Sequence, residues 1–550
     1  MNYDFRRIDI AFKNGKVITV DDQDTLAEAV GIKGNKIVFV GTNAELDTLI
    51  DDTTKVIDLK GRALTPGFID THIHPFLIGS LNDDLDSPMI DLFGGKATSV
   101  AGILDKIREV LTVKKPGQWV SMWGYEVYNL KENRDPTIEE LDAVAPNNPV
   151  QCMEGSGHKS MFNSRALETI GVYTAEDAKK YPAGDIEVKD GKLTGMVFGI
   201  TLFLLWSKVE FTQEGMEKAA LRCSDEFLRA GLTSIHDMGA FDRPSYHTMQ
   251  KLCRQRRFKP RVCMALHSVF GKPFSMEDND HFLALGYQTG LGDEYFRVGA
   301  CKFMIDGGSS GPSCYTREPY SHDPSKHREK AWDREEVAEY IKRINDAECQ
   351  ATAHAIGDGA VEYMVEGYEK AFATNPRPDL RHRIEHCSLV DQDLIDRMAK
   401  MNICPSVNAG MVAKNGAAYA RFFGERNKYF AALKSMLEAG IKCSMHSDAP
   451  SGPYGVACLD SAVNRYDRIH NVQCDKTQAV SVLDALRCYT INGAYASFEE
   501  DIKGSIEVGK LADLVVLDRD ILEIPQETLY QTQVDLTMVD GEIVYTREEA

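Results

Sequence analysis

The chain has 550 residues, of which 43% are hydrophobic, so it is long enough for one large catalytic domain with accessory segments. Its formal net charge of -20 argues against nucleic acid as a partner, because affinity for a phosphate backbone comes mainly from clustered cations. The 13 cysteines form no CxxC pair and several lie in apolar runs, which is typical of reduced, packed thiols in the cytoplasm.

The N-terminal segment lacks the uninterrupted apolar run of a signal peptide. The longest apolar stretch, residues 196–206, is too short to span a bilayer. We therefore expect a cytoplasmic protein that does not cross a membrane. We also expect a homodimer.

Both ends of the chain have the alternating pattern of β-strands. Residues 7–60 contain three such runs separated by Asn-Gly and Gly-Asn turn signals, and the C-terminal segment repeats this character around an Asp-Gly turn. A few terminal strands cannot bury a core alone. We therefore expect residues 1–62 and 499–550 to pair into one small β-sandwich.

The central part of the chain predicts an α/β fold, a (β/α)8 TIM barrel over residues 63–498. Eight short β-type runs end in polar residues and are mostly followed by helical patterns, as a parallel barrel requires. Seven of the 14 histidines fall at or near the ends of these runs. They are His72, His74, His236, His267, His354, His386 and His446.

The connection from the first run to the second, about residues 76–225, is far longer than an ordinary βα loop and must be an insertion. Insertions after barrel strands lie on the active-site face, so its aromatic clusters around Trp123 and Trp206 are candidate pocket walls. In the alternative interpretation these aromatic side chains form the core of the insertion itself.

The sharpest motif, residues 67–75, is an apolar strand that ends in His72 and His74. Residues i and i+2 of a strand share a face, so both imidazoles point the same way, as two ligands of one metal require. Lys302, His354, His386 and Asp448 close four other predicted strands. Except for the lysine, which needs modification, this set suits Zn²⁺, Fe²⁺, Mn²⁺ or Ni²⁺ better than Ca²⁺.

These motifs together resemble the amidohydrolase superfamily, and within it the amidohydrolase 3 group of metal-dependent hydrolases, which includes N-substituted formamide deformylases. The resemblance rests on GFIDTHIHP, EGSGHKSMFNSRAL around His158, GLTSIHDMG, CKFMIDGG, AHAIGD, RHRIEH, SDAP and GSIEVGKLADLVVLD, which together span almost the whole chain. It implies one or two divalent metals, with zinc the first expectation, and a bridging carboxylated lysine at Lys302. An unmodified ammonium has no acceptor and cannot ligate, so a Lys302 that pairs instead with Asp306 would leave a mononuclear centre.

The expected reaction is hydrolysis of a carbon–nitrogen bond in an amide, formamide or cyclic amide by metal-activated water. Asp448 is the predicted catalytic base and acid, while His158, Asp306 and Trp123 are predicted to bind a small substrate with an apolar or aromatic group. After Asp306 the chain lacks the arginine that many relatives carry, which indicates a specialised pocket. Two alternatives stay open: decarboxylation or ester cleavage on the same centre, and a non-catalytic barrel scaffold.

Overall fold

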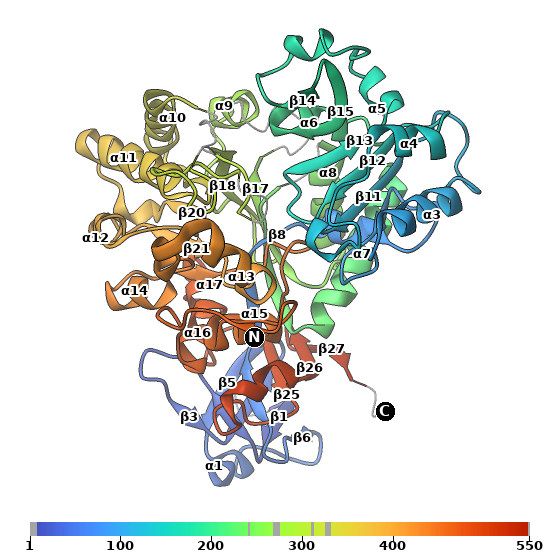
Figure 1. Ribbon diagram of the computed structural model, residues 1–550. Coiled ribbons are helices and arrows are strands. Elements are labelled where there is room, and N and C mark those ends of the chain that lie inside the picture. The colour runs from blue at the N-terminus through green and yellow to red at the C-terminus, as the bar shows by residue number, and fades with distance from the viewer. Residues whose placement is uncertain (1–7, 240–242, 268–275, 310–312, 325–331, 548–550) are drawn as a thin grey trace.

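The computed structural model describes residues 8–239, 243–267, 276–309, 313–324 and 332–547. Its centre is an eight-stranded parallel sheet in which strands consecutive in the chain are neighbours (Figure 1). The strands are β8 (Phe68–Ile73), β16 (Leu232–Asp237), β17 (Arg261–Leu266), β18 (Phe296–Met304), β19 (Ala351–Ala355), β20 (Arg383–His386), β21 (Cys404–Val407) and β22 (Ser444–Met445). All eight predicted strands are present, and the predicted (β/α)8 barrel is confirmed.

The barrel closes between its last strand and its first. The backbone N–H of Asp448 donates to the carbonyl of His72 over 3.0 Å, and that of His74 donates to Ala449 over 3.2 Å. These two bonds lie at the carboxyl ends of both strands, where reactive groups gather in this fold. Closure of the barrel therefore brings the His72 and His74 strand against Asp448.

Helices cover the outside of the barrel and alternate with its strands (Figure 1). The helices after the second strand are α8 (Arg243–Arg254), α9 (Glu277–Ala284), α10 (Arg334–Asp346), α11 (Asp358–Thr374), α12 (Gln392–Lys400), α13 (Val412–Phe423), α14 (Leu433–Glu438), α15 (Val456–Asn464), α16 (Val482–Cys488) and α17 (Ile491–Ala496). Within the described ranges, no helix has both the length and the apolar character to cross a membrane.

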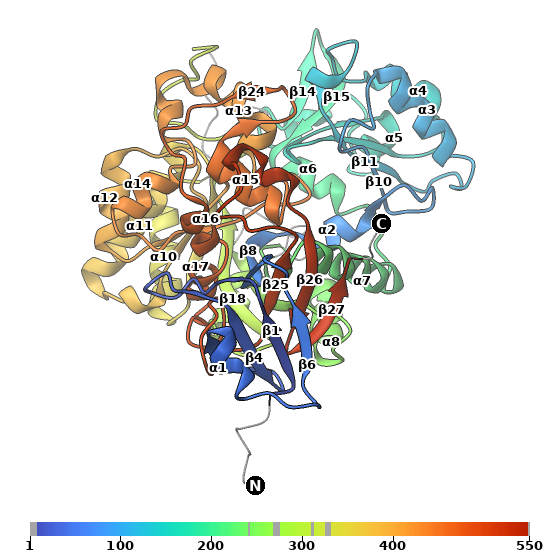
Figure 2. The ribbon, with the colours of Figure 1, turned by 90° about the horizontal axis from the view of Figure 1, so that it is seen from below.

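The two ends of the chain form the expected β-sandwich, seen beside the barrel in Figure 2. One sheet has the order β27-β26-β25-β7-β2-β3 and the other the order β5-β4-β1-β6. The strands are β1 (Ile10–Lys13), β2 (Lys16–Ile18), β3 (Leu26–Ala27), β4 (Ala29–Lys33), β5 (Lys36–Gly41), β6 (Lys55–Asp58), β7 (Ala63–Pro66), β25 (Leu514–Leu517), β26 (Val534–Val539) and β27 (Glu542–Thr546). Apolar residues from both ends share one core between the sheets.

The run that we expected to open the barrel is divided between two sheets. Strand β7 pairs with β25 in the sandwich, and β8 begins two residues later as the first barrel strand. Gly67 joins them, and a Cβ there would lie 2.1 Å from the Thr233 hydroxyl, so only glycine fits. Because only one residue separates the last sandwich strand, β7, from the first barrel strand, β8, no linker marks a boundary between the two parts. The domain bounds given in the sequence analysis therefore stay predictions.

The insertion after the first barrel strand folds around a sheet of its own, with the order β14-β15-β13-β12-β11-β10-β9. Its elements are α2 (Pro75–Ser80), β9 (Leu81–Asn82), β10 (Met89–Asp91), α3 (Val100–Val110), β11 (Val120–Tyr125), α4 (Ile138–Val144), β12 (Val150–Glu154), β13 (Lys159–Phe162), α5 (Ser164–Glu168), β14 (Ile186–Lys189), β15 (Lys192–Phe198) and α6 (Gly199–Trp206). Helix α7 (Gln213–Arg229) then returns the chain to the barrel.

The aromatic residues of the insertion divide between its two faces. In β11, Val120, Met122 and Tyr125 belong to the insertion's own core, whereas Trp123 packs with Phe203 and Trp206 in the main core. Successive strand residues point to opposite faces, which explains why Met122 and Trp123 separate. The face with Met122 forms the insertion's own core, whereas the face with Trp123 packs in the main core, so for that face both interpretations stay open.

Candidate active site

One cavity of about 80 Å³ lies at the carboxyl ends of the barrel strands, against the insertion. All six predicted ligands line it, together with His158 and Trp123. Its full lining is His72, His74, Leu77, Trp123, Ser156, Gly157, His158, Phe203, Trp206, His267, Lys302, Met304, His354, His386, Asp448 and Ser451. The barrel supplies the six candidate ligands, and the insertion supplies Trp123, Phe203 and Trp206 together with Ser156 and His158.

His72, His74 and Asp448 form one close group of candidate ligands. Oδ1 of Asp448 lies 3.3 Å from Nε2 of His74 and 3.6 Å from Nε2 of His72. One donor atom from each residue lies within 4.8 Å of the other two, a spacing that suits one metal ion. Burial raises the pKa of Asp448, but the hydrogen bond from His74 and the neighbouring histidines lower it below its ordinary value.

The ring of His72 is fixed by a residue that the sequence analysis missed. Nδ1 of His72 lies 2.9 Å from Oε2 of Glu385, which is fully buried. A carboxylate only accepts hydrogen bonds, so Nδ1 carries the proton and Nε2 keeps the lone pair that faces the cavity. Glu385 also accepts from Arg383, through Nε over 2.8 Å and Nη2 over 3.0 Å.

Lys302 lies deep in the same group, with its Nζ 3.2 Å from Nε2 of His72. Burial lowers the pKa of Lys302 to about 8, which favours the neutral amine that carboxylation requires. The alternative partner, Asp306, forms no ion pair with Lys302 among the residues that the structure describes. The lysine is therefore available to the centre.

His354 and His386 stand side by side, with ring centres 4.4 Å apart. Nε2 of His354 lies 3.2 Å from the carbonyl of Gly307, which only accepts. The bond assigns the proton to Nε2 and leaves Nδ1 of His354 as its ligand atom. The backbone φ is 69° at His386 and 57° at Asp448. These two candidate ligands therefore occupy the left-handed region, which residues other than glycine rarely adopt.

The aromatic wall comes from three side chains of the insertion. The Trp123 and Trp206 rings meet edge to face with centres 5.5 Å apart, and Phe203 stacks on Trp206 at 6.2 Å. Nε1 of Trp123 donates to the carbonyl of Glu154 over 3.0 Å, and the residue also lines the cavity. His158 lies between the aromatic side chains and the candidate ligands. The centre of its ring is 5.1 Å from that of His354 and 6.5 Å from that of Phe203.

Asp306 is not among the residues that line the cavity. Its carboxylate accepts backbone N–H groups from Tyr315, Ile356 and Gly357 over 3.0, 3.1 and 2.9 Å. The side chain therefore organises the loops around Gly307, the acceptor of His354. Residues 310–312 of the loop that lacks the expected arginine lie outside the described residues.

Arg383 and Glu385 could have been found from the sequence. Both are charged residues in a run otherwise predicted as a buried strand, and positions i and i+2 share a face. His236 was singled out as a strand-end histidine, but its Nδ1 accepts from Nη1 of Arg383 over 2.8 Å, and it does not line the cavity. His267 does line it.

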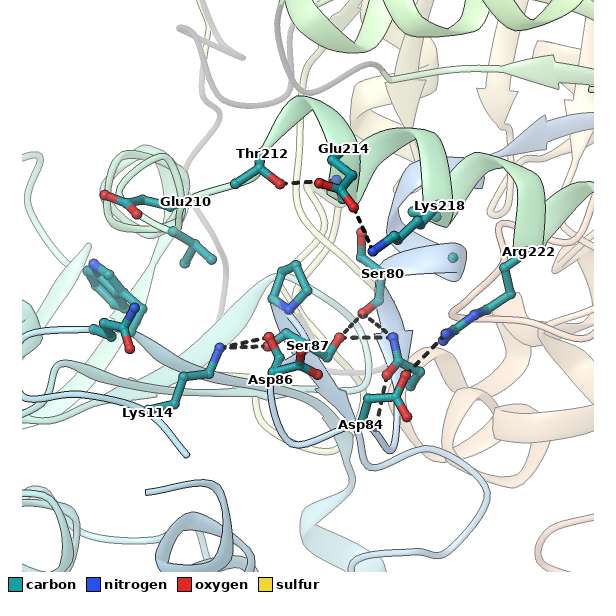
Figure 3. A pocket seen from close by; sticks show the side chains of 18 of the residues that line it. Ser80, Asp84, Asp86, Ser87, Lys114, Glu210, Thr212, Glu214, Lys218 and Arg222 are labelled. Carbon is teal, nitrogen blue, oxygen red and sulfur yellow. Dashed lines mark hydrogen bonds and ion pairs between the residues drawn. The ribbon is translucent and has the colours of Figure 1, made fainter. Parts of the chain in front are cut away.

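A larger cavity of about 580 Å³ lies elsewhere, at the seam where the insertion leaves and rejoins the barrel (Figure 3). Its charged groups largely bind one another: Lys218 pairs with Glu214 at 2.8 Å and Arg222 with Asp84 at 3.2 Å. Lys114 donates to the backbone carbonyls of Asp86 and Ser87. None of the candidate ligands lines this cavity, so size alone does not identify the active site.

The cavity at the strand ends fits a divalent transition metal. Imidazole nitrogens and a carboxylate are the ligands that zinc and similar ions prefer, and here they converge from separate strands. The bond of His72 to Glu385 uses Nδ1 of His72, and the bond of His354 to Gly307 uses Nε2 of His354. In each of these two rings, the other nitrogen keeps the lone pair that a metal requires. Buried partners that orient the ligands in this way are characteristic of metal sites.

Comparison with known proteins finds relatives with a similar sequence and structures with a similar fold. The chain is 29% identical over 565 residues to N-substituted formamide deformylase of Arthrobacter pascens, with 98% of each protein covered. An uncharacterized metal-dependent hydrolase from Pyrococcus horikoshii has a similar fold, with a TM-score of 0.72 at 23% identity over 94% of this chain and 99% of that one. The zinc complex of atrazine chlorohydrolase from Arthrobacter aurescens also shares the fold, with a TM-score of 0.55 at 14% identity over 98% and 95%.

The sequence profile described as the amidohydrolase family matches residues 55–545, nearly the whole chain. This protein therefore belongs to the amidohydrolase family and is a metal-dependent hydrolase of carbon–nitrogen bonds.

Proposed function

We propose that this enzyme hydrolyses an amide or formamide that carries an apolar or aromatic group beside the scissile bond. The observation behind the proposal is the composition of one cavity, in which His72, His74 and Asp448 face the aromatic side chains of Trp123 and Trp206. Burying an aromatic group against such a wall contributes roughly 25 cal/mol per Å² of apolar surface. The deformylase of Arthrobacter pascens, whose name specifies N-substituted formamides, makes this substrate class the first to test.

The proposed ligands are His72, His74, Lys302, His354, His386 and Asp448, with zinc as the preferred metal. A divalent metal held there would act as a Lewis acid and make hydroxide available near neutral pH. Carboxylation of Lys302 would let two ions bind: the neutral amine attacks CO2, a nitrogen–carbon bond forms, and the amine proton leaves to solvent. The resulting carbamate has two oxygen ligands where the ammonium has none.

The side chains around the centre have separate roles in this proposal. Asp448 takes the proton of the attacking water on its carboxylate and delivers it to the leaving nitrogen. His158 lies between the ligand His354 and the aromatic Phe203, where it would contact the substrate carbonyl. Trp123 and Trp206 exclude water and orient the apolar group.

The proposal is tested by metal analysis combined with a substrate comparison. The purified enzyme would be assayed on N-benzylformamide and on formamide, with release of formate and of amine or ammonia as readouts. We expect bound zinc and a strong preference for the N-benzyl compound. A protein that carries zinc but prefers formamide would contradict the apolar substrate, whereas full activity without metal would contradict the centre itself.

A homodimer and a cytoplasmic location also remain part of the proposal, and sedimentation and cell fractionation test them.

A further inference from the structure

His446 is a buried imidazole beside the centre, and the proposed reaction gives it no role. It lies two residues before Asp448, and Nε2 of His446 lies 3.1 Å from Nδ1 of His386. One donor atom each of His72, His386 and His446 lie within 4.8 Å of one another, so His446 could be read as a further ligand. The contacts of His446 argue against that reading.

Both ring nitrogens of His446 already have partners. Nε2 faces His386, and Nδ1 lies 2.9 Å from the hydroxyl of Ser406. His446 has no exposed surface and does not line the cavity, although His386 does. His446 therefore stands behind His386 as seen from the cavity and has no nitrogen left for a metal.

The chain of hydrogen bonds continues from His446 to the backbone. The Ser406 hydroxyl lies 2.7 Å from that of Thr71, and Thr71 donates to the carbonyl of Met445 over 3.1 Å. A carbonyl only accepts, so the bond from Thr71 to Met445 sets the direction of the chain. Ser406 then donates to Thr71, His446 donates from Nδ1 to Ser406, and Nε2 of His446 is left as an acceptor.

The donor-to-acceptor direction of this chain also decides which ring nitrogen of His386 carries the proton. A neutral imidazole has one N–H donor and one acceptor nitrogen. Because Nε2 of His446 accepts, His386 donates from Nδ1 and keeps the lone pair on Nε2. The reverse direction would put a proton on Nε2 of His386 and leave the carbonyl of Met445 without its donor. The left-handed backbone of His386 also needs such a support, because its φ of 69° is strained.

We propose that His446, with Ser406 and Thr71, is a positioning residue that fixes the tautomer and ring orientation of His386, so that Nε2 of His386 serves the metal. This inference rests on the proposed function, because it assumes that His386 is a ligand. His446 supports that ligand through a neutral hydrogen-bond chain, whereas Glu385 supports His72 through a carboxylate. The centre would thus have two supports on different strands, and Arg383 links them, since it donates both to Glu385 and to the backbone carbonyl of Thr71.

The test compares four variants in equilibrium binding of Co²⁺ against a chelator, and in the visible spectrum of the bound Co²⁺. His446→Gln can present its amide oxygen near the place of Nε2 and should bind with nearly wild-type affinity and spectrum. His446→Leu and Ser406→Ala remove links of the chain, and each should weaken binding about 10- to 100-fold. Ser444→Ala is the matched control, because its hydroxyl also contacts Thr71 at 3.0 Å but lies off the chain to His446, so wild-type binding is expected.

Thermal unfolding of each variant separates loss of metal affinity from loss of the fold. A His446→Gln variant that loses cobalt and changes the spectrum, beside an unaltered Ser406→Ala, would show that His446 is a ligand. Wild-type affinity in His446→Leu would show that the chain has no role. Failure of the wild-type protein to bind cobalt would instead overturn the metal centre of the proposed function, and this inference with it.

Discussion

Glu385 on β20 and His72 on β8, two strands that are not neighbours in the sheet, are joined by a hydrogen bond of 2.9 Å between Oε2 and Nδ1. Neither side chain has appreciable exposed surface, at 0% and 1%. A buried carboxylate of this kind orients the imidazole and raises its basicity as a ligand.

Replacing Glu385 with Gln should weaken metal binding about 10- to 100-fold, because the amide lacks the negative charge that raises the basicity of His72. The measurement is metal retained at equilibrium with a chelator. Loss of the carboxylate also leaves Arg383 unpaired, so the melting temperature should fall. Thr352→Val is the control, since Thr352 contacts Oε1 of the same carboxylate over 2.8 Å but does not touch His72. Equal metal affinity in Glu385→Gln and the wild type would refute the orienting role.

Asp448→Asn should reduce kcat about 10²- to 10⁴-fold, because an amide holds no proton in transit. We expect metal content to change much less, since the amide keeps an oxygen and the other five proposed ligands remain. Steady-state kinetics with metal analysis on the same preparation check this prediction. Turnover at the wild-type level would remove Asp448 from the proton transfers.

Trp123→Ala and Trp206→Ala should each lower kcat/KM on an N-benzyl substrate about 10- to 100-fold, the effect of losing 1.5 to 3 kcal/mol of apolar burial. The effect on a small polar substrate should be several-fold weaker. Trp119→Ala is a matched control, because Trp119 lines the larger cavity at the seam. Equal losses on both substrates with a lowered melting temperature would assign the two tryptophans to packing alone.

The reactivity of Lys302 should depend on pH in a defined direction. Burial lowers its pKa to about 8, so the amine is protonated and inert toward CO2 below that value and reactive above it. Metal-free enzyme given Zn²⁺ and ¹³C-bicarbonate should therefore show a carbamate signal by NMR at pH 8.5 and much less at pH 6.5. Lys302→Arg retains the positive charge but cannot form the carbamate under these conditions, so its spectrum should lack the signal. A carbamate signal that persists in Lys302→Arg would assign the modification to another residue.

The barrel and the cavity that gathers the candidate ligands could be predicted because both depend on local pattern. Short apolar runs that end in His72, His354 or Asp448 specify a strand, its direction and the group at its end. The β-sandwich could be predicted from the alternation of polar and apolar residues at both ends of the chain. These features need no knowledge of which distant residues touch.

The contacts that tune the site could not be predicted in this way. The division of the run at Gly67 depends on the close approach of Thr233, and the place of Asp306 depends on loops around Tyr315 and Ile356. Such pairings are set by tertiary packing, so periodicity does not reveal them. The contact of His446 with His386 belongs to the same class, although His446 was visible in the sequence as one of the histidines at the strand ends.

The pairing of β7 with β25 has a consequence for biosynthesis. The strand that leads directly into His72 lies near the start of the chain, but its neighbour in the sandwich, Leu514–Leu517, emerges from the ribosome near the end. Until then one edge of β7 is unpaired, and an exposed edge invites pairing with other chains. The nascent protein must therefore keep β7, the strand that precedes His72, out of wrong pairings through most of its synthesis. The proposed ligand Asp448 also lies late in the chain, so the proposed metal site is complete only after most of the chain has been synthesised.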